Sequence, residues 1–515
     1  MKSQFGGRKI SMDGTNPVFQ YRQLMNVWLP RFKLTGRLAL VVALIPLALI
    51  AAPEAEPMPP PAPRRPSIIL IMADDLGYGD LGCYGQTKIQ TPNLDKLARE
   101  GIRFSNAYAG STVCAPSRAA LMLGDHTGHL NIRGNAAITT LQPNELTLAE
   151  MLKTAGYKTA LIGKWGLTAK DQPGVPQKKG FQEFLGYLDN MEAHDYYPEW
   201  IWRYDPPRPG HGGFDGLRRN RENSGGQRNL YLPDLFTKAA LNFLSINKPT
   251  AFNRYQPFFL FLSYNLPHAN NEEGQRTGNG MQVPSDAPYS SETWPAPEKN
   301  KAAMITRLDA YVGQIMDQLV RLQMDTNTVV IFTSDNGPHA EGGVKVDFFK
   351  SARNLRGYKR DLYEGGIRVP AIVRWPFRTR PNQVNDLVWA NWDWLATFAD
   401  LALTKPPTNT DSISIYPTLV GQPQTNKHDF LYWEFHERGF QQAARTGDWK
   451  AVRPQADEPL ELYNLASDPR ERLNLASQHP EIIAKFETYF KTARTESPAW
   501  PIKPKPPEKK EGNAK

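Results

Sequence analysis

Two apolar runs of the chain each end in hard oxygen donors. The runs are SIILIMADD at residues 67–75 and NTVVIFTSDNG at residues 327–337, and the side chains that close them are Asp74, Asp75, Asp335 and Asn336. An uninterrupted apolar run of this length is typical of a buried parallel strand. Carboxylate and amide oxygens without histidine suit Ca²⁺ or Mg²⁺ rather than zinc. We therefore predict a divalent-cation site where two strands of one sheet end.

Basic side chains are also predicted to lie at the end of the sheet that carries the acidic residues. The set is Arg118, Lys164, His268 and Lys359, of which Lys164 and His268 close further apolar runs. Taken singly, each is typical of a solvated surface charge. Together they would lie at the carboxyl end of a parallel sheet, where α/β proteins bind ligands. A divalent cation beside converging basic groups forms a site for a tetrahedral oxyanion, either sulfate or phosphate.

Cys114 is one of only two cysteines in 515 residues, in the stretch STVCAPSRAALMLGDH at residues 111–126. A buried packing residue is the ordinary role of an isolated cysteine. A reactive group at the start of a helix is the alternative, because the first turn offers free N–H donors and a favourable dipole to an anion. The residues alone leave both open. Cys83, among glycines in DLGCYG, is predicted to be a packed thiol, with no disulfide framework.

The elements that must position these side chains alternate between strands and helices. Helical patterns at residues 91–101, 301–323 and 387–403 separate apolar runs, which predicts an α/β fold with a mostly parallel sheet covered on both faces. From about residue 410, short strand-like pieces precede a final helix near residues 480–494. This change predicts a smaller C-terminal α+β domain.

The N-terminus is predicted to be a targeting segment. LALVVALIPLALIAA, at residues 38–52, is free of charge and follows Arg31, Lys33 and Arg37, as in a signal peptide. Fifteen apolar residues with an internal proline are short for a membrane-spanning helix, which favours the signal peptide. An uncleaved anchor is the alternative. We expect a periplasmic or extracellular protein, attached to a membrane only if this segment is retained.

Composition divides the chain into five parts. These are a signal peptide or anchor (1–52), a Pro-rich linker (53–66), a main α/β domain (67–409), a C-terminal α+β domain (410–497) and a basic tail predicted to be disordered (498–515). The formal net charge of +9 comes from the two basic ends, whereas residues 67–502 are balanced. The charge is therefore weak support for a polyanion, and we expect no nucleic-acid partner.

The motif CAPSR at residues 114–118 resembles the Cys-x-Pro-x-Arg signature of the type I, formylglycine-dependent sulfatases of the alkaline phosphatase superfamily. Further motifs follow in the family's order over residues 67–495, among them MADDLGYGDLGCYG, GYKTALIGKW, TSDNGP and LRGYKRDLYEGGIRVPAI. The resemblance implies an alkaline-phosphatase-like sheet with a small C-terminal domain, and makes residues 67–409 the catalytic domain. It also implies an arylsulfatase-type enzyme that hydrolyses sulfate esters to an alcohol and inorganic sulfate.

In sulfatases of this type a maturation enzyme oxidises the signature cysteine to formylglycine, and the resemblance implies the same for Cys114. One hydroxyl of the hydrated aldehyde would attack sulfur and expel the alcohol, and the second would then collapse and eject sulfate. The implied ligands of Ca²⁺ are the modified Cys114, Asp74, Asp75, Asp335 and Asn336. Arg118 would stabilise the formylglycine. Lys164 and Lys359 would hold the sulfate, and His268 would bind it or protonate the leaving oxygen.

One position departs from the family pattern. Many members have Gly-Lys-Trp-His where this chain has GKWG, so Gly166 replaces a histidine expected to contact the formylglycine hydroxyl. His194, in EAHDYYPEW, is the predicted substitute at the substrate site, and an ordinary loop histidine is the alternative. A catalytically impaired anion-binding relative and a phosphoesterase on the same fold are the competing functions. The missing set of histidine ligands argues against a two-zinc phosphatase.

The segment 187–214 is rich in aromatic residues and is predicted to be loop-like. Its tyrosine and tryptophan side chains suit stacking on sugar rings, or equally a place in the core or the anchor of a lid. We therefore expect a sulfated carbohydrate as the substrate, with aryl sulfates as surrogates.

Cleavage of the N-terminal segment is directly testable. We expect the intact mass of the exported protein to lack residues 1–52, because a signal peptidase removes the apolar region during export. Mass spectrometry of the protein recovered from the periplasm or the medium measures this. A mass that includes residues 1–52 would contradict cleavage and favour the anchor.

Overall fold

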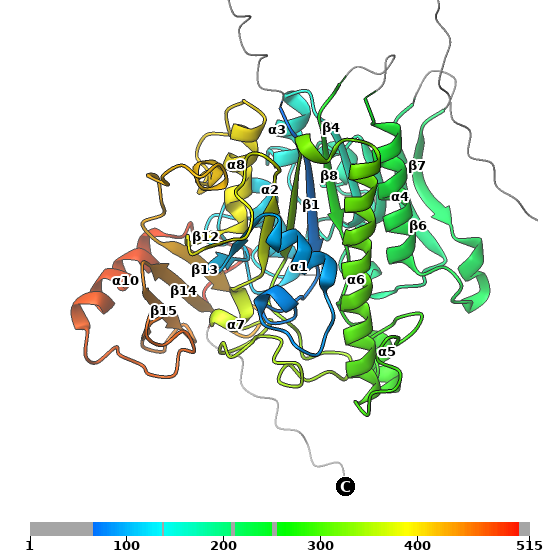
Figure 1. Ribbon diagram of the computed structural model, residues 1–515. Coiled ribbons are helices and arrows are strands. Elements are labelled where there is room, and N and C mark those ends of the chain that lie inside the picture. Colours follow the sequence, from blue (N-terminus) through cyan, green and yellow to red (C-terminus); the bar gives the residue numbers. More distant parts are fainter. Residues whose placement is uncertain (1–64, 136–138, 208–211, 250–254, 504–515) are drawn as a thin grey trace, which may run out of the picture. The chain divides into compact units, whose positions relative to one another are not determined.

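The computed structural model describes residues 65–135, 139–207, 212–249 and 255–503 (Figure 1). The predicted signal peptide, most of the predicted linker and the last part of the basic tail lie outside these residues. Among the described residues, no helix is both long enough and apolar enough to cross a membrane.

A ten-stranded mixed sheet forms the centre of the fold. Its strands, from one edge to the other, are β11 (Gln383–Asn385), β2 (Ile102–Phe104), β10 (Ala371–Arg374), β9 (Thr328–Ser334), β1 (Ser67–Ala73), β8 (Phe258–Ser263), β4 (Lys158–Lys164), β5 (Glu183–Tyr187), β6 (Trp200–Asp205) and β7 (Phe214–Arg219). The consecutive strands from β9 to β5 are parallel to one another. Their carboxyl ends therefore meet at one end of the sheet, as expected from the sequence.

Helices cover both faces of this sheet (Figure 1). One face carries α2 (Cys114–Leu123), α3 (Leu148–Thr154) and α8 (Trp394–Leu401), and the other carries α1 (Pro92–Arg99), α4 (Leu232–Ile246) and α6 (Ala296–Arg321). Strand β1 shows how the sequence serves both layers. Its residues Ile68 and Leu70 belong to the first core and Ile69 and Ile71 to the second, because successive side chains of a strand alternate between faces.

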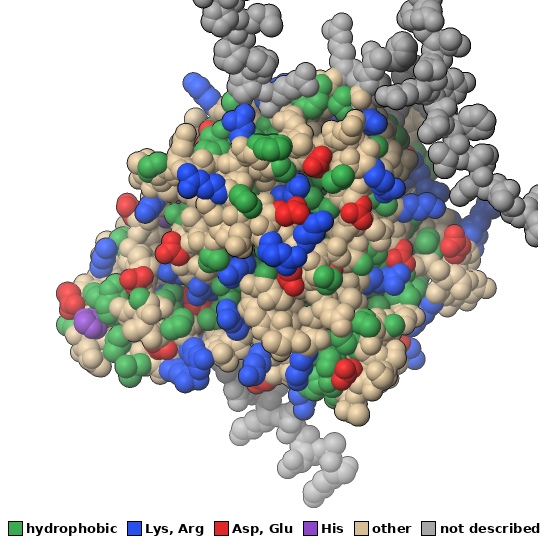
Figure 2. Space-filling model, in the orientation of Figure 1, with side chains coloured by type: hydrophobic (Ala, Val, Ile, Leu, Met, Phe, Trp, Pro, Cys, Tyr) green, Lys and Arg blue, Asp and Glu red, His purple; other side chains and the backbone are tan. Residues whose placement is uncertain are grey.

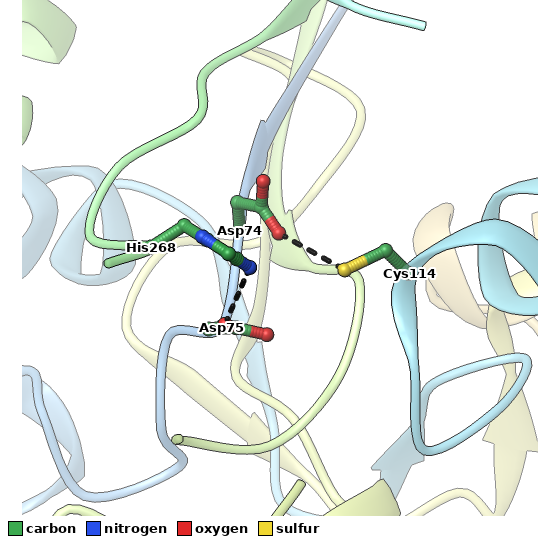
Figure 3. Close-up of side chains that lie close together, drawn as sticks. All are labelled: Asp74, Asp75, Cys114 and His268. Atoms are coloured by element: carbon green, nitrogen blue, oxygen red, sulfur yellow. Dashed lines mark hydrogen bonds and ion pairs between the residues drawn. The ribbon is translucent and has the colours of Figure 1, made fainter. Parts of the chain in front are cut away.

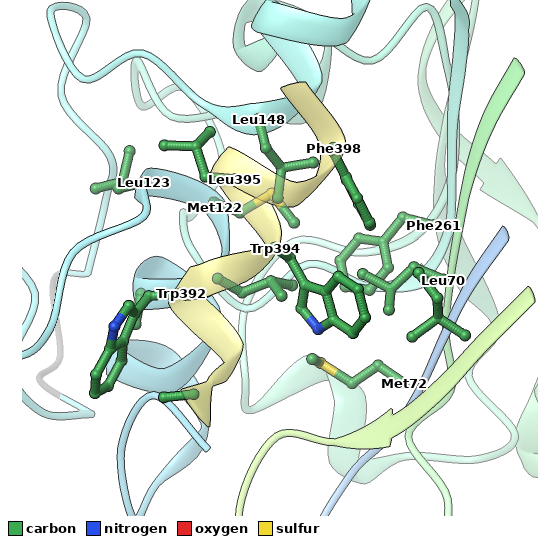
Figure 4. Packing of buried hydrophobic residues seen from close by; sticks show 14 of the residues in the cluster. Leu70, Met72, Met122, Leu123, Leu148, Phe261, Trp392, Trp394, Leu395 and Phe398 are labelled. Carbon is green, nitrogen blue, oxygen red and sulfur yellow. The ribbon is translucent and has the colours of Figure 1, made fainter. Parts of the chain in front are cut away.

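The first core is dense in aromatic side chains (Figure 4). Trp394 and Phe398 of α8 lie between the strands and the helices α2 and α3. Their rings are 5.4 Å apart, and Phe398 also meets Phe259 of β8 edge to face at 5.7 Å. This packing fixes the helix that begins at Cys114 against the sheet.

A four-stranded antiparallel sheet forms the C-terminal part. Its strands are β13 (Leu431–Phe435), β14 (Gln441–Thr446), β15 (Trp449–Arg453) and β16 (Glu461–Asn464), with α10 (Pro480–Thr492) packed against them. Trp433 and Phe435 belong to the same core as α2. The predicted smaller C-terminal part is thus present, but the described residues form one compact unit, and a boundary at residue 410 stays a prediction.

Two stretches differ from the sequence-based expectation. The helix expected over residues 387–403 begins only at Trp394, because the preceding residues form β12 (Trp389–Ala390), which pairs with β3 (Ala107–Tyr108), and then a 3₁₀ turn. The segment 187–214 is not only loop, since its residues 200–205 form β6. Hydrogen bonds to both neighbouring strands stabilise β6, and sequence periodicity does not reveal those partners.

A buried charge network joins the C-terminal sheet to the main sheet domain and generates a stability prediction. Lys450 of β15 lies 3.0 Å from Glu364, in α7 (Glu364–Ile367), and 2.8 Å from Glu471, and all three side chains are buried. We expect Lys450→Met to lower the free energy of unfolding by about 3–5 kcal/mol, because it removes the ammonium group between two buried carboxylates and leaves Glu364 with Arg368, at 3.3 Å, as its ion-pair partner. Urea unfolding at neutral pH measures the change.

Lys96→Met is the matched control. Lys96 is exposed and pairs with Glu100 at 3.8 Å within one helix, so its replacement should change stability by about 0.5 kcal/mol or less. Equal effects of the two substitutions would contradict the role given to the buried network.

Candidate active site

The structure gathers all of the polar residues predicted from the strand ends at one place. Asp74 and Asp75 follow β1, Asp335 and Asn336 follow β9, and Lys164 is the last residue of β4. Cys114 and Arg118 lie in the first turns of α2, while His268 and Lys359 come from loops after β8 and β9. Each of these side chains is at most 3% exposed. Such deep burial of charge requires close partners.

The acidic residues interlock at the ends of β1 and β9. The Asn336 Nδ2 atom donates to Asp75 Oδ1 at 2.6 Å, and the Asp75 backbone N–H donates to Asp335 Oδ1 at 3.1 Å. Asp75 has φ +64°, a left-handed conformation that a non-glycine residue adopts at some expense in free energy. This turn aims two consecutive carboxylates at the same small volume.

Cationic side chains surround the carboxylates. Arg118 contacts Asp335 through Nε at 3.0 Å and Nη2 at 2.8 Å, a two-pronged arrangement that holds both groups in place. The Lys164 ammonium lies 2.8 Å from Asp74 Oδ2, and the Lys359 ammonium lies 2.8 Å from Asp75 Oδ2. Each of the two consecutive aspartates is therefore paired with a different lysine.

Cys114 faces this cluster from the start of α2 (Figure 3). Its Sγ atom lies 3.4 Å from Asp74 Oδ1. Burial raises the pKa of the Cys114 thiol well above its ordinary value, although the Lys164 ammonium acts in the opposite direction. A thiol that stays protonated is a poor nucleophile, so the residue in its unmodified form is unsuited to attack a sulfate ester.

His268 completes the cluster beside Asp75 (Figure 3). Its Nδ1 atom lies 2.7 Å from the Ala269 carbonyl oxygen and its Nε2 atom 3.0 Å from the Lys359 ammonium. Burial, with the added repulsion of Lys359, lowers the pKa of His268 to about 3. The ring is therefore neutral at physiological pH, with Nδ1 as donor and Nε2 as acceptor.

The donor set fits a hard divalent cation. Burial and the neighbouring Asp74 carboxylate raise the pKa of Asp335 to about 7, so the buried carboxylates repel one another. The Oδ1 atom of Asn336 is buried, and none of the described residues donates a hydrogen bond to it. Asp74, Asp75 and Cys114 hold donor atoms within 4.8 Å of one another, as a shared ion requires. A Ca²⁺-sized cation would use the free amide oxygen and relieve the repulsion.

Gly166 and His194, the two positions tied to the family departure, occupy different surroundings. Gly166 is buried with φ +74°, and a Cβ atom there would lie 2.8 Å from Asn190 Oδ1. His194 stacks on the His268 ring at 4.9 Å and pairs with Glu272 at 3.0 Å. His194 therefore lies next to the predicted sulfate-binding histidine, and its role as a substitute stays a prediction.

The aromatic segment 187–214 serves more than one purpose. Tyr196 is fully buried and its hydroxyl donates to the backbone carbonyls of Asn265 and His268, at 2.5 and 2.6 Å. For this residue the core alternative is correct, and it also holds the loop that bears His268. Trp200 is 49% exposed, so this aromatic side chain of the segment is open to solvent and free to meet a ligand.

Several residues at the site escaped the sequence analysis. Ser263 binds Arg118 Nη1 at 2.7 Å, and Glu341 lies 3.3 Å from the Lys359 ammonium. Asn135 lies beside the start of α2, and Asn190 lies beside Gly166. Ser263 is the last residue of β8, just as Lys164 is the last residue of β4. Its position at a strand end is the sequence signal that could have identified Ser263. The two asparagines lie in loops, where sequence periodicity carries no information.

The fold and site together define a hydrolase of the alkaline-phosphatase-like α/β class, with a buried cluster of acidic and basic side chains around Cys114. Residues 66–404 match the Sulfatase family, and residues 357–496 match the family described as N-sulphoglucosamine sulphohydrolase, C-terminal. The chain belongs to the sulfatase family, which confirms the predicted fold class and the prediction of a sulfuric ester hydrolase.

Named relatives and solved structures agree with this membership. The chain is 29% identical to N-acetylgalactosamine-6-O-sulfatase of Bacteroides thetaiotaomicron, covering 84% of this chain and 94% of the relative. It is 32% identical to human arylsulfatase A, covering 82% and 86%. The crystal structure of Ps i-CgsB in complex with k-i-k-neocarrahexaose is similar with a TM-score of 0.69, at 26% identity over 85% of this chain and 95% of that one.

The cation site generates a binding prediction. We expect Ca²⁺ added to chelator-treated protein to raise the thermal unfolding midpoint by several degrees, because a ligand at a hundred times its Kd stabilises the folded state by about 2.7 kcal/mol. Differential scanning fluorimetry measures the shift. Asn336→Leu, which removes the free amide oxygen, should abolish most of it.

Asn131→Leu is the control, since Asn131 is exposed and lies in a loop outside the site. It should keep the full calcium shift. An unchanged calcium shift in Asn336→Leu would remove Asn336 from the ligand set.

Proposed function

We propose that this sulfatase releases inorganic sulfate from sulfated carbohydrates, with aryl sulfates as surrogate substrates. The observation that carries the proposal is the convergence of Arg118, Lys164, Lys359 and His268 on Cys114 and the acidic cluster. The names of relatives add support for a carbohydrate, since one is an N-acetylgalactosamine-6-O-sulfatase and one structure is a complex with k-i-k-neocarrahexaose. A sulfated sugar is therefore the substrate class we infer.

The nucleophile is inferred to be formylglycine formed from Cys114 by a maturation enzyme. Formylglycine in its hydrated form supplies a hydroxyl nucleophile, and Ca²⁺ beside it supplies positive charge for the sulfate oxygens. Asp74, Asp75, Asp335 and Asn336 would hold the ion, with residue 114 as a further ligand. Support comes from the unpartnered amide oxygen of Asn336 and from the raised pKa of the Cys114 thiol.

The basic residues then divide the work on the sulfate group. Arg118 is tied to Asp335 and to the Lys164 carbonyl oxygen, so it is rigid and would orient residue 114. Lys164 and Lys359 flank the acids and would bind the sulfate oxygens as two fixed charges. Their ammonium groups are already desolvated, which strengthens their attraction for an anion.

His268 is inferred to act with Lys359 on the leaving oxygen. The neutral ring accepts a hydrogen bond from the Lys359 ammonium at Nε2. A negatively charged sulfate ester bound beside the ring would favour uptake of a proton from water at Nε2, and His268 would then pass that proton to the departing alcohol while Lys359 stays charged. Glu341, which also contacts Lys359, would keep that lysine charged.

The protein is proposed to work outside the cytoplasm, as the predicted signal peptide implies, and to meet polymer fragments there. A membrane attachment would apply only if the N-terminal segment is retained. The competing phosphoesterase finds little support, because among the described residues each of the two ligand groups that include Asp75 contains a single histidine, His268 in one and His339 in the other.

Release of sulfate tests the proposal. The protein is co-expressed with a formylglycine-generating enzyme and given sulfated monosaccharides, sulfated oligosaccharides and an aryl sulfate. We expect free sulfate, detected by ion chromatography, and its complete loss in Cys114→Ala. An aryl phosphate is assayed in parallel, and zinc-dependent release of phosphate from it without sulfate release from the panel would contradict the proposal and favour the phosphoesterase. Binding without turnover by protein shown to carry formylglycine would favour the impaired relative.

Lys359→Ala should lower kcat/KM by about a hundredfold or more, because it removes a preorganised charge from the transition state. Lys170→Ala is the matched control, since its ammonium is mostly exposed and pairs only with Asp171 at 3.9 Å. Equal activities of Lys359→Ala and the parent would remove Lys359 from the sulfate site.

A further inference from the structure

A buried amide oxygen lies beside the stems of two basic residues of the site. The oxygen is Oδ1 of Asn190, in the loop after β5, and no described residue donates a hydrogen bond to it. That oxygen is 2.8 Å from the place where a Cβ of Gly166 would stand, and the same point is 3.2 Å from Arg118 Cδ and 3.5 Å from Lys164 Cε. A buried acceptor without a donor destabilises the protein, so its retention calls for a ligand or a functional group.

The surrounding backbone holds Asn190 at this place. Two backbone hydrogen bonds join the loop after β4 to the loop after β5. The Trp165 N–H donates to the Tyr187 carbonyl at 2.9 Å, and the Gly166 N–H donates to the Leu188 carbonyl at 3.1 Å. Gly166 has no side chain and adopts a left-handed conformation that favours glycine. The space that any larger residue would need at position 166 is therefore available to Asn190.

A second asparagine sets the orientation of the Asn190 amide. Asn135 Oδ1 accepts the backbone N–H of Ala115, the residue directly after Cys114, at 2.9 Å. Because this oxygen is an acceptor, the group that Asn190 turns toward it must be its NH₂, and the two atoms are 3.5 Å apart. The Asn190 oxygen consequently faces the other way, toward Gly166 and the stems of Arg118 and Lys164.

The number of donors on residue 114 changes with its chemical form. The thiol of Cys114 has one weak donor, which lies against Asp74 Oδ1 at 3.4 Å. The hydrate of formylglycine, the form required by the proposed function on which this inference rests, has two hydroxyl groups. One hydroxyl group would point toward Asp74 as the thiol does, and the second would need a hydrogen-bond acceptor on another side of residue 114.

We propose that Asn190 Oδ1 accepts a hydrogen bond from the second hydroxyl of hydrated formylglycine 114, and that Asn135 orients Asn190 for this contact. An amide oxygen is not basic at neutral pH, so Asn190 takes no proton. Its effect is to favour the hydrate over the free aldehyde and to fix the direction of the attacking hydroxyl.

The experiment compares Asn190→Leu, which removes the acceptor at similar volume, with Asn190→Asp, which keeps an acceptor oxygen. Both are made in the full chain with a formylglycine-generating enzyme. A hydrazide probe reports the free aldehyde, because its terminal nitrogen adds to the aldehyde carbon with loss of water, and intact mass gives the rate. Steady-state kinetics with an aryl sulfate gives kcat and KM.

We expect Asn190→Leu to react with the hydrazide about tenfold faster than the parent and to lose about tenfold in kcat with KM unchanged, as for one lost hydrogen bond. Asn190→Asp should retain slow capture. Asn131→Leu, an exposed asparagine, should match the parent in both measurements. Circular dichroism melting checks each fold, and Asn190→Ala replaces the leucine variant if that one does not fold.

Parental rates of both capture and turnover in the folded Asn190→Leu or Asn190→Ala variant would overturn the inference. Faster capture in His194→Ala, with no change in the Asn190 variants, would overturn it in favour of His194 as the acceptor. Absence of capture in every variant, with a free thiol by mass, is a different result. It would mean that residue 114 is not formylglycine, and it would overturn the proposed nucleophile and this inference together.

Discussion

The structure depends on balanced charge in a buried site at the carboxyl end of a parallel sheet. The charged groups are Asp74, Asp75 and Asp335 on one side and Arg118, Lys164 and Lys359 on the other, all almost completely buried. Each would destabilise the fold strongly if left alone, and close contact with groups of opposite charge offsets that cost. Because three acids offset three bases, an added divalent cation leaves the site net positive, which is the condition for holding a sulfate group.

The rest of the fold keeps the nucleophile position aligned with this charge cluster. The Ser117 hydroxyl donates to the Asp335 carbonyl, so α2 is attached to the end of β9. The Trp433 indole N–H of the C-terminal sheet donates to the Ala109 carbonyl at 2.9 Å, just before that helix. The C-terminal sheet therefore supports the loop that leads to Cys114, which explains why it shares a core with the main sheet domain rather than forming a separate body.

A second set of loops surrounds His268 and Gly166. Tyr196 holds the backbone of His268, and His194 stacks on the His268 ring. The loops after β4 and β5 are joined by backbone hydrogen bonds and bring Asn190 next to Gly166. These loops are built on rigid strands, so small changes in them alter the site without disturbing the sheet.

Local sequence determined the strands β1, β4, β8 and β9, because an apolar run buried on both faces is visible in the residues themselves. It also determined that carboxylates and basic groups end those runs. The family motifs singled out Cys114, rather than Cys83, as the predicted formylglycine position. Tertiary structure alone decided which groups meet. Arg118 faces Asp335, β6 becomes a strand through its neighbours, and Asn190 fills the space at Gly166, since each of these contacts joins residues far apart in the chain or in separate loops.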